Sequence, residues 1–294
     1  MIASLTQFAA SLRSLAEQRR RWRLPLLILG LAIFLGGCIW SVARLDIAAD
    51  DIRWQSMALL ALVLAPLGLV YAAANMLVTA RAARVEMDFA RSFRVASLAQ
   101  LAEVLPLPGG ALVRTAALVQ GGAKASHSAG HVVANALIWI ACAAIAAGLS
   151  LAHLGTAPLL LAAVGAVILM VSLVWLARYA GVAIAVISLS LRLFGLLLVA
   201  VRLFVAFAAL SLVVAFPETL VFAFASIAGS AASIAPAGLG ISEGLAAIFA
   251  QATSNVPAAA FIAVGLNRLT SLLVAGLASA ILTLAGSRPS PLSE

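Results

Sequence analysis

Long apolar segments alternate with short polar ones along this chain of 294 residues, and about six of the apolar segments are long enough to cross a bilayer. A helix rises about 1.5 Å per residue and the hydrocarbon core is roughly 30 Å thick, so about 20 apolar residues span it. The pattern predicts membrane-spanning helices at 24–43, 54–79, 127–151, 159–176, 195–216 and 258–285. We expect 179–193 to lie at the membrane interface, because 181–216 is too long for one span and too short for two.

Two further apolar segments are interrupted by helix breakers. The segment 95–125 contains Leu105-Pro106-Leu107-Pro108-Gly109-Gly110, and the segment 219–253 contains Pro236-Ala237-Gly238-Leu239-Gly240. Lipid offers the backbone no hydrogen-bond partners, so irregular backbone at membrane depth must be shielded by protein or face a wet cavity. The pattern therefore predicts two re-entrant hairpins.

The order of these elements recurs in the two halves of the chain. Residues 24–151 read as span, span, hairpin and span, and residues 157–285 repeat that order from the opposite side of the membrane. Inverted repeats with an interrupted helix in each half are typical of transporters, whose binding site lies near the interruptions. We predict an all-α, polytopic helical bundle that forms a single transmembrane domain over 1–294.

The composition agrees with a membrane protein, because 65% of the residues are hydrophobic and 10% are charged. A soluble domain has about 45–50% apolar and about 25% charged residues. The net charge of +8 does not indicate nucleic-acid binding, since the basic residues lie in short segments between apolar runs. Such segments mark the cytoplasmic side. The basic stretch 81–94 and the acidic stretch 46–53 thus place both termini in the cytoplasm, with 1–23 as an amphipathic surface helix or only a topology signal.

Charged residues inside apolar sequence are the candidates for chemistry, because charge is costly at membrane depth. Arg114 follows the first break, Glu243 follows the second, and Arg268 lies in the last span. The fixed fork of donors on arginine suits a phosphate group. The alternative is an ion pair that only locks the hairpins, and either arginine could pair with Glu243. Glu103 also lies near the first hairpin, and we assign no role to Arg202.

The common enzyme motifs are missing from the sequence. His127 and His131 have a spacing that could bind a metal, but no third ligand lies nearby in the sequence. The chain contains no nucleophile elbow, phosphate-binding loop or dinucleotide fingerprint. We expect no enzyme activity, no metal and no cofactor, and any transport would be passive or driven by an ion gradient.

The two breaks carry a family resemblance. Ala235-Pro-Ala-Gly-Leu-Gly-Ile-Ser-Glu243, with an arginine in the last span, resembles the Pro-Gly-Gly-x-Gly-x-x-Glu signature of the lysylphosphatidylglycerol synthase transmembrane-region family. Leu105-Pro-Leu-Pro-Gly-Gly-Ala-Leu-Val-Arg114 is similar to the Pro-Gly-x-x-x-Arg region of that family. The resemblance implies movement of lipids across the bacterial inner membrane. The family's aminoacyltransferase domain has no counterpart in these residues, so synthase activity is not expected.

We expect a flippase-like protein that translocates a phospholipid or a related lipid. The residues expected to meet the substrate are Pro106, Gly109, Gly110, Arg114, Pro236, Gly238, Gly240, Glu243 and Arg268. Two alternatives stay open: an ion-coupled transporter of small solutes, and a non-transporting partner of a lipid-modifying enzyme or glycosyltransferase. The expected partners are membrane lipids with anionic headgroups, further copies of the chain in a homo-oligomer, or such an enzyme, and not nucleic acid.

Overall fold

A computed structural model describes residues 25, 28–46, 48–103, 109–231 and 238–286, which are mostly helical and contain no β-strand. Six helices in these residues are long and apolar enough to cross a membrane. Their bounds are Ile28–Leu45, Trp54–Ala82, Ala125–Ser150, Thr156–Ala180, Val182–Ala209 and Pro257–Leu284. The chain is thus an all-α, multi-pass membrane bundle, as the hydropathy pattern predicts. The predicted surface helix over 1–23 lies outside the described residues.

The second span is continuous but changes its winding near Pro66. It consists of α2 (Trp54–Leu59), the π-helical turn η2 (Leu60–Leu64) and α3 (Ala65–Ala82). A proline ring lacks an N–H and clashes with the carbonyl four residues earlier, and a wider turn relieves that clash. A π-helical turn just before Pro66 therefore accommodates the proline without ending the span.

The predicted interfacial segment 179–193 and the predicted span 195–216 are wrong. One helix, α8 (Val182–Ala209), covers most of both ranges, and it follows α7 (Thr156–Ala180) almost directly. The physical reason is Gly181, whose φ of 97° ends α7 and lets the chain reverse within one residue. The apolar stretch is therefore one long helix from Val182 to Ala209, and Gly181 alone connects it to α7.

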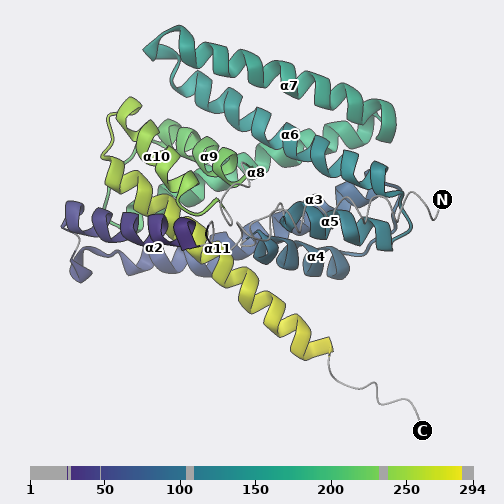
Figure 1. Cartoon of the computed structure of the whole chain (residues 1–294), viewed down its shortest axis with the longest axis horizontal. Helices are drawn as coiled ribbons and strands as arrows, with labels where there is room; N and C mark the ends of the chain where they lie inside the picture. Colours follow the sequence, from purple (N-terminus) through teal and green to yellow (C-terminus); the bar gives the residue numbers. More distant parts are fainter. Residues whose placement is uncertain (1–24, 26–27, 47, 104–108, 232–237, 287–294) are drawn as a thin grey trace.

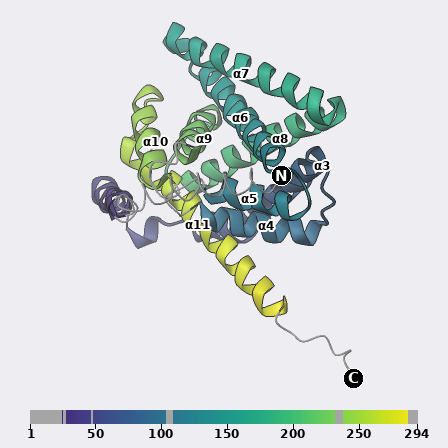
Figure 2. The same cartoon turned by 45° about the vertical axis from the view of Figure 1, so that its right-hand side comes forward.

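Each half of the chain contains a pair of shorter helices at the predicted hairpin. The first pair is α4 (Phe89–Ala102) and α5 (Gly109–Gln120), and the second is α9 (Phe216–Ala231) and α10 (Ile241–Ala252). The helices of each pair contact each other. Figures 1 and 2 show α4 and α5 toward one end of the molecule and α9 and α10 toward the other. The order span, span, hairpin, span thus recurs with α6 (Ala125–Ser150) and α11 (Pro257–Gly286) closing the two halves.

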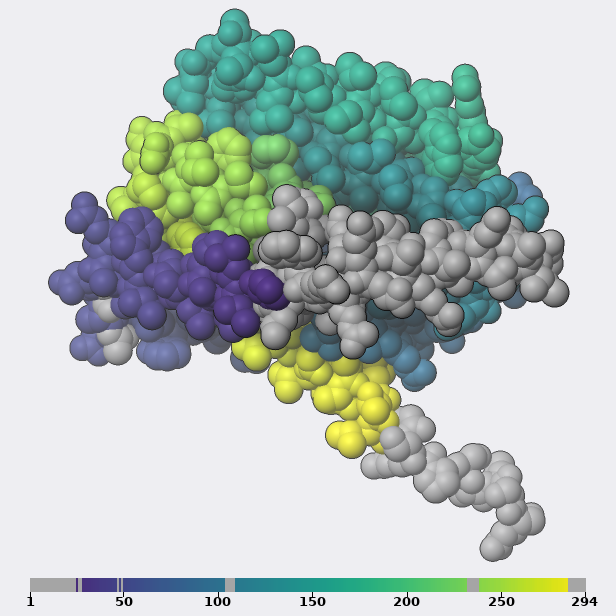
Figure 3. All heavy atoms as spheres, viewed as in Figure 1, coloured from purple at the N-terminus to yellow at the C-terminus, as the bar shows by residue number. Residues whose placement is uncertain are grey.

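The largest apolar core lies where α8, α9 and α11 meet α6 and α10. Phe207 and Phe222 are fully buried there, with ring centroids 5.4 Å apart in a stacked arrangement. The first span lies at the edge of the bundle, beside α10 and α11 (Figure 3). Phe34 is its buried apolar anchor, whereas most of its other side chains are exposed, as expected for a helix that faces lipid.

Candidate functional site

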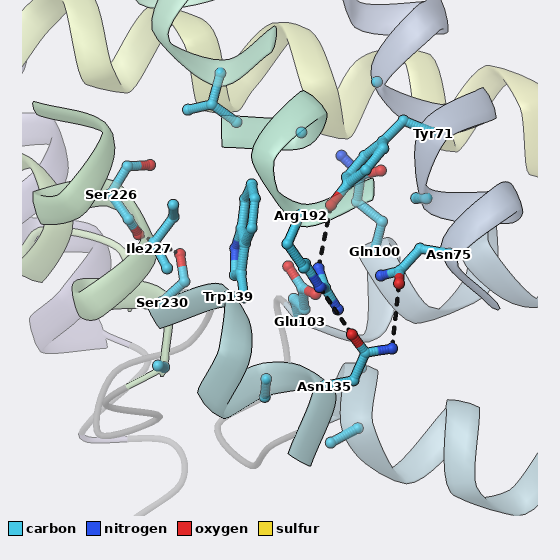
Figure 4. A pocket seen from close by; sticks show the side chains of 18 of the residues that line it. Tyr71, Asn75, Gln100, Glu103, Asn135, Trp139, Arg192, Ser226, Ile227 and Ser230 are labelled. Atoms are coloured by element: carbon cyan, nitrogen blue, oxygen red, sulfur yellow. Dashed lines mark hydrogen bonds between the residues drawn. The ribbon is translucent and has the colours of Figure 1, made fainter. Parts of the chain in front are cut away.

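The two hairpins border one cavity of about 560 Å³. Glu103, Gly109, Gly110 and Arg114 of the first hairpin line it, together with Ser226 and Ser230 of the second. Helices α3, α6, α8 and α11 complete the wall, and Figure 4 shows side chains of both halves projecting toward the same space. The cavity thus lies between the two halves, and its lining is partly polar although it is built from apolar helices.

The second hairpin is held by a buried ion pair. Arg268 Nη1 on α11 lies 3.0 Å from Glu243 Oε1, and the Glu243 side chain is fully buried. The same carboxylate accepts a hydrogen bond of 2.8 Å from the backbone N–H of Gly240, which caps the start of α10. Arg268 Nη2 also donates to Ser230 Oγ on α9 at 3.4 Å. Of the two partners that the sequence allows for Glu243, the structure therefore selects Arg268, whose guanidinium joins both helices of the hairpin to α11.

The first hairpin contains its own ion pair, which is more open. Arg114 Nη2 on α5 donates to Glu103 Oε1 at 3.3 Å, and the two side chains are 35% and 43% exposed. Glu103 directly follows α4, so this pair bridges the two sides of the break. Arg114 therefore pairs with Glu103, and the alternative pairing with Glu243 is wrong. A pair this exposed contributes about 0–1 kcal/mol to stability.

The breaks require glycine at particular positions. Gly238 and Gly240 have φ angles of 63° and 78°, and residues that carry a Cβ rarely adopt this backbone conformation. A Cβ on Gly240 would also lie 2.7 Å from Ile33 Cγ2 on the first span. A Cβ on Gly109 would overlap the carbonyl oxygen of Ala102, so α4 and α5 approach closely there. The predicted residues Pro106 and Pro236 lie outside the described part of the chain.

The sequence interpretation missed a polar network around Arg192 (Figure 4). Arg192 Nε on α8 donates to Asn135 Oδ1 at 2.8 Å, and Nη1 donates to the hydroxyl of Tyr71 at 3.2 Å. The guanidinium carbon lies 5.2 Å from the ring centroid of Trp139. Asn135 Nδ2 in turn donates to Thr79 Oγ1 at 2.7 Å. The sequence did contain a sign of this site, because Arg192 is a charged residue within a long apolar stretch. We assigned 179–193 to the membrane interface, where an arginine needs no explanation, and so did not consider Arg192.

Arg202 is a second residue whose place was missed. It lies further along α8, is 7% exposed, and borders the same cavity. Its Nη2 donates to the backbone oxygen of Asn267 at 3.1 Å and to Ser271 Oγ, both on α11. Arg202 therefore joins α8 to α11.

The cavity is electropositive, as four arginines of the described chain line it: Arg114, Arg192, Arg202 and Arg268. Within the described residues, the carboxylates that pair with them are Glu103 and Glu243, so two of the four positive charges have no carboxylate partner there. Net positive charge with low-dielectric walls attracts anions. Among the described residues, no group of three or more His, Cys, Asp or Glu could hold a metal ion.

No family model matches this chain, and no curated protein matches it either.

Proposed function

We propose that this protein translocates lipids with an anionic headgroup across the bacterial inner membrane. The observation that carries the proposal is the cavity between the two hairpins, with arginines from α5, α8 and α11 on its wall. A lipid phosphate requires positive charge at membrane depth, while its acyl chains remain in the bilayer. Arginine supplies planar, bidentate donors that match phosphate oxygens.

The repeated architecture supports transport. One pair of short helices in each half points to a site near the middle of the membrane, and both pairs contribute to this cavity. The resemblance of the segments 105–114 and 235–243 to the lysylphosphatidylglycerol synthase transmembrane-region family favours a lipid as the cargo. We therefore prefer lipid translocation to transport of a soluble solute.

The charge distribution supports one orientation in the membrane. The connection between α3 and α4 is bordered by Arg81, Arg84, Arg91 and Arg94, whereas the connection before α2 contains Asp50 and Asp51. Arginine-rich short connections stay on the cytoplasmic side. With six spans and two hairpins that re-enter on their own side, both termini are proposed to be cytoplasmic.

A second candidate is transport of a soluble organic anion. The amide and hydroxyl groups of Asn75, Asn135, Tyr71 and Gln100 on the cavity wall favour it, because a small polar solute could hydrogen-bond to them. Such a protein would move the anion and leave lipid distribution unchanged.

The test uses the full chain in proteoliposomes that contain fluorescent phosphatidylglycerol or phosphatidylcholine, with reduction of the outer label by dithionite. We expect the native protein to make phosphatidylglycerol from the inner leaflet accessible faster than phosphatidylcholine. Arg114→Gln should reduce the rate of phosphatidylglycerol translocation at least threefold. Arg178→Gln is the matched control, since this exposed arginine at the end of α7 does not line the cavity.

The contrary results have distinct meanings. If the native protein moves neither lipid faster than empty liposomes, lipid translocation is rejected. Uptake of a radiolabelled organic phosphate in the same vesicles would then favour the soluble-anion transporter. If neither cargo moves, the third alternative, a membrane partner of a lipid-modifying enzyme or glycosyltransferase, becomes the leading hypothesis.

A further inference from the structure

We propose that Arg192 is the primary anion-binding residue of the cavity and that it receives a phosphate oxyanion, an inference that rests on the proposed transport of an anionic substrate. The arginines of the cavity differ in whether a carboxylate already neutralises their charge. Arg268 faces the buried carboxylate of Glu243, and Arg114 faces Glu103. Within the described residues, no carboxylate forms an ion pair with Arg192.

Neutral groups hold the guanidinium of Arg192 in place. Asn135 Oδ1 accepts from Nε, the Tyr71 hydroxyl accepts from Nη1, and the Trp139 ring lies 5.2 Å from the guanidinium carbon. These dipoles and the aromatic ring orient the group without cancelling its charge. The guanidinium is therefore fixed in position and still attracts an anion.

The orientation of Asn135 is itself determined by its neighbours. Its Nδ2 donates to Thr79 Oγ1 on α3 at 2.7 Å, and the amide oxygen of Asn75 on the same helix accepts from Arg192 Nη2 at 2.6 Å and Nη1 at 3.0 Å. With its nitrogen engaged by Thr79, the oxygen of Asn135 must face Arg192. A binding group whose supporting residues are also held by hydrogen bonds loses little freedom when a ligand arrives.

Arg202 is a poorer candidate, although it also has no carboxylate partner among the described residues. The Nε of Arg202 has no hydrogen-bond partner among the described residues, but the residue is only 7% exposed and its Nη2 donates to two acceptors on α11, so a ligand has little access to it. Arg192 is only partly buried, and its network extends along the cavity wall (Figure 4). Position and accessibility therefore assign the anion to Arg192.

The shared ligand chemistry is a phosphate group, which a lipid headgroup or a free phosphate could supply. The probes are dihexanoyl-phosphatidylglycerol, dihexanoyl-phosphatidylcholine and inorganic phosphate, titrated by calorimetry into the full chain in a detergent without charge. We expect the native protein to bind dihexanoyl-phosphatidylglycerol most tightly. Arg192→Gln should weaken that binding at least tenfold, and Arg178→Gln should leave it unchanged.

A second variant separates binding from folding. Asn135→Asp places a carboxylate where the amide oxygen accepts from Arg192 Nε at 2.8 Å, so it supplies the missing internal partner. We expect the melting temperature to stay within a few degrees of the native protein, while binding of dihexanoyl-phosphatidylglycerol falls at least tenfold. A residue that only supports the fold would predict unchanged binding in this variant.

The outcomes distinguish this inference from the proposed function. Native affinity in folded Arg192→Gln and Asn135→Asp overturns the role of Arg192, even if lipid translocation is observed. No binding of any probe by the native protein overturns it too. If inorganic phosphate binds as tightly as the lipid and both variants lose it, the Arg192 site is supported and the lipid cargo is rejected.

Discussion

The two hairpins have the same order of elements but differ in how their breaks are held. In the second hairpin, the Glu243–Arg268 pair is almost completely buried, and the carboxylate also caps α10 through Gly240. In the first, the Glu103–Arg114 pair is more than one third exposed on each side and stays within the hairpin. We infer that the two hairpins have different roles. The second is fixed to α11 by its buried pair, whereas in the first Arg114 can release Glu103 and bind a ligand instead.

Removing Glu243 should have the largest effect, because it leaves a buried arginine without its partner. We expect Glu243→Ala to lower the free energy of unfolding by about 3–5 kcal/mol, the usual consequence of breaking a buried pair. The measurement is unfolding of the purified chain in mixed detergent micelles, followed by circular dichroism.

The matched variant in the first hairpin is Glu103→Ala. Its partner Arg114 remains partly exposed, so water can solvate it, and we expect a loss of less than about 1 kcal/mol. Equal losses for the two variants would contradict the proposed difference between the hairpins.

A glycine in the second break should have an intermediate effect. Gly240→Ala forces a Cβ into a backbone region with φ of 78° and against Ile33, and we expect it to reduce stability by about 1–3 kcal/mol. Gly244→Ala is the control one turn later in α10, where a Cβ would meet no atom within 4 Å. Because alanine favours a helix over glycine, that control should gain about 0.5–1 kcal/mol. The measurement is the melting temperature of both variants in the same detergent. An unchanged melting temperature for Gly240→Ala would show that the backbone at this break adjusts to a Cβ without loss of stability.

The hydropathy pattern was sufficient to predict six long apolar helices and a pair of shorter helices in each half, because bilayer thickness fixes helix length. The hydropathy pattern failed at 179–216. One helix ends and the next begins at Gly181, which has a positive φ, and both flanking segments are apolar, so hydropathy does not mark the boundary. The periodicity of apolar residues does not report the backbone angle of a single glycine.

Candidate residues were predictable where charge interrupts apolar sequence, but their partners were not. Arg114, Glu243 and Arg268 stand out in the sequence, whereas the choice of Arg268 as the partner of Glu243 depends on how α10 contacts α11. The neutral groups that orient Arg192 come from α3 and α6, far apart in the chain. Asparagine, tyrosine and tryptophan in apolar helices have many structural uses, so the sequence did not single them out.

The smallest expected effect concerns the exposed pair, and it tests whether the first hairpin responds to substrate. Glu103→Gln keeps the size of the side chain and removes its charge, so Arg114 loses a competitor for an anionic headgroup. Since an exposed pair is worth about 0–1 kcal/mol, we expect affinity for dihexanoyl-phosphatidylglycerol to rise by up to about fivefold. The same calorimetric titration measures it, with Glu86→Gln as the control for removal of a carboxylate away from the cavity. Weaker binding would mean that Glu103 positions Arg114 for the ligand, and the contrast between a fixed hairpin and a responsive one would then fail.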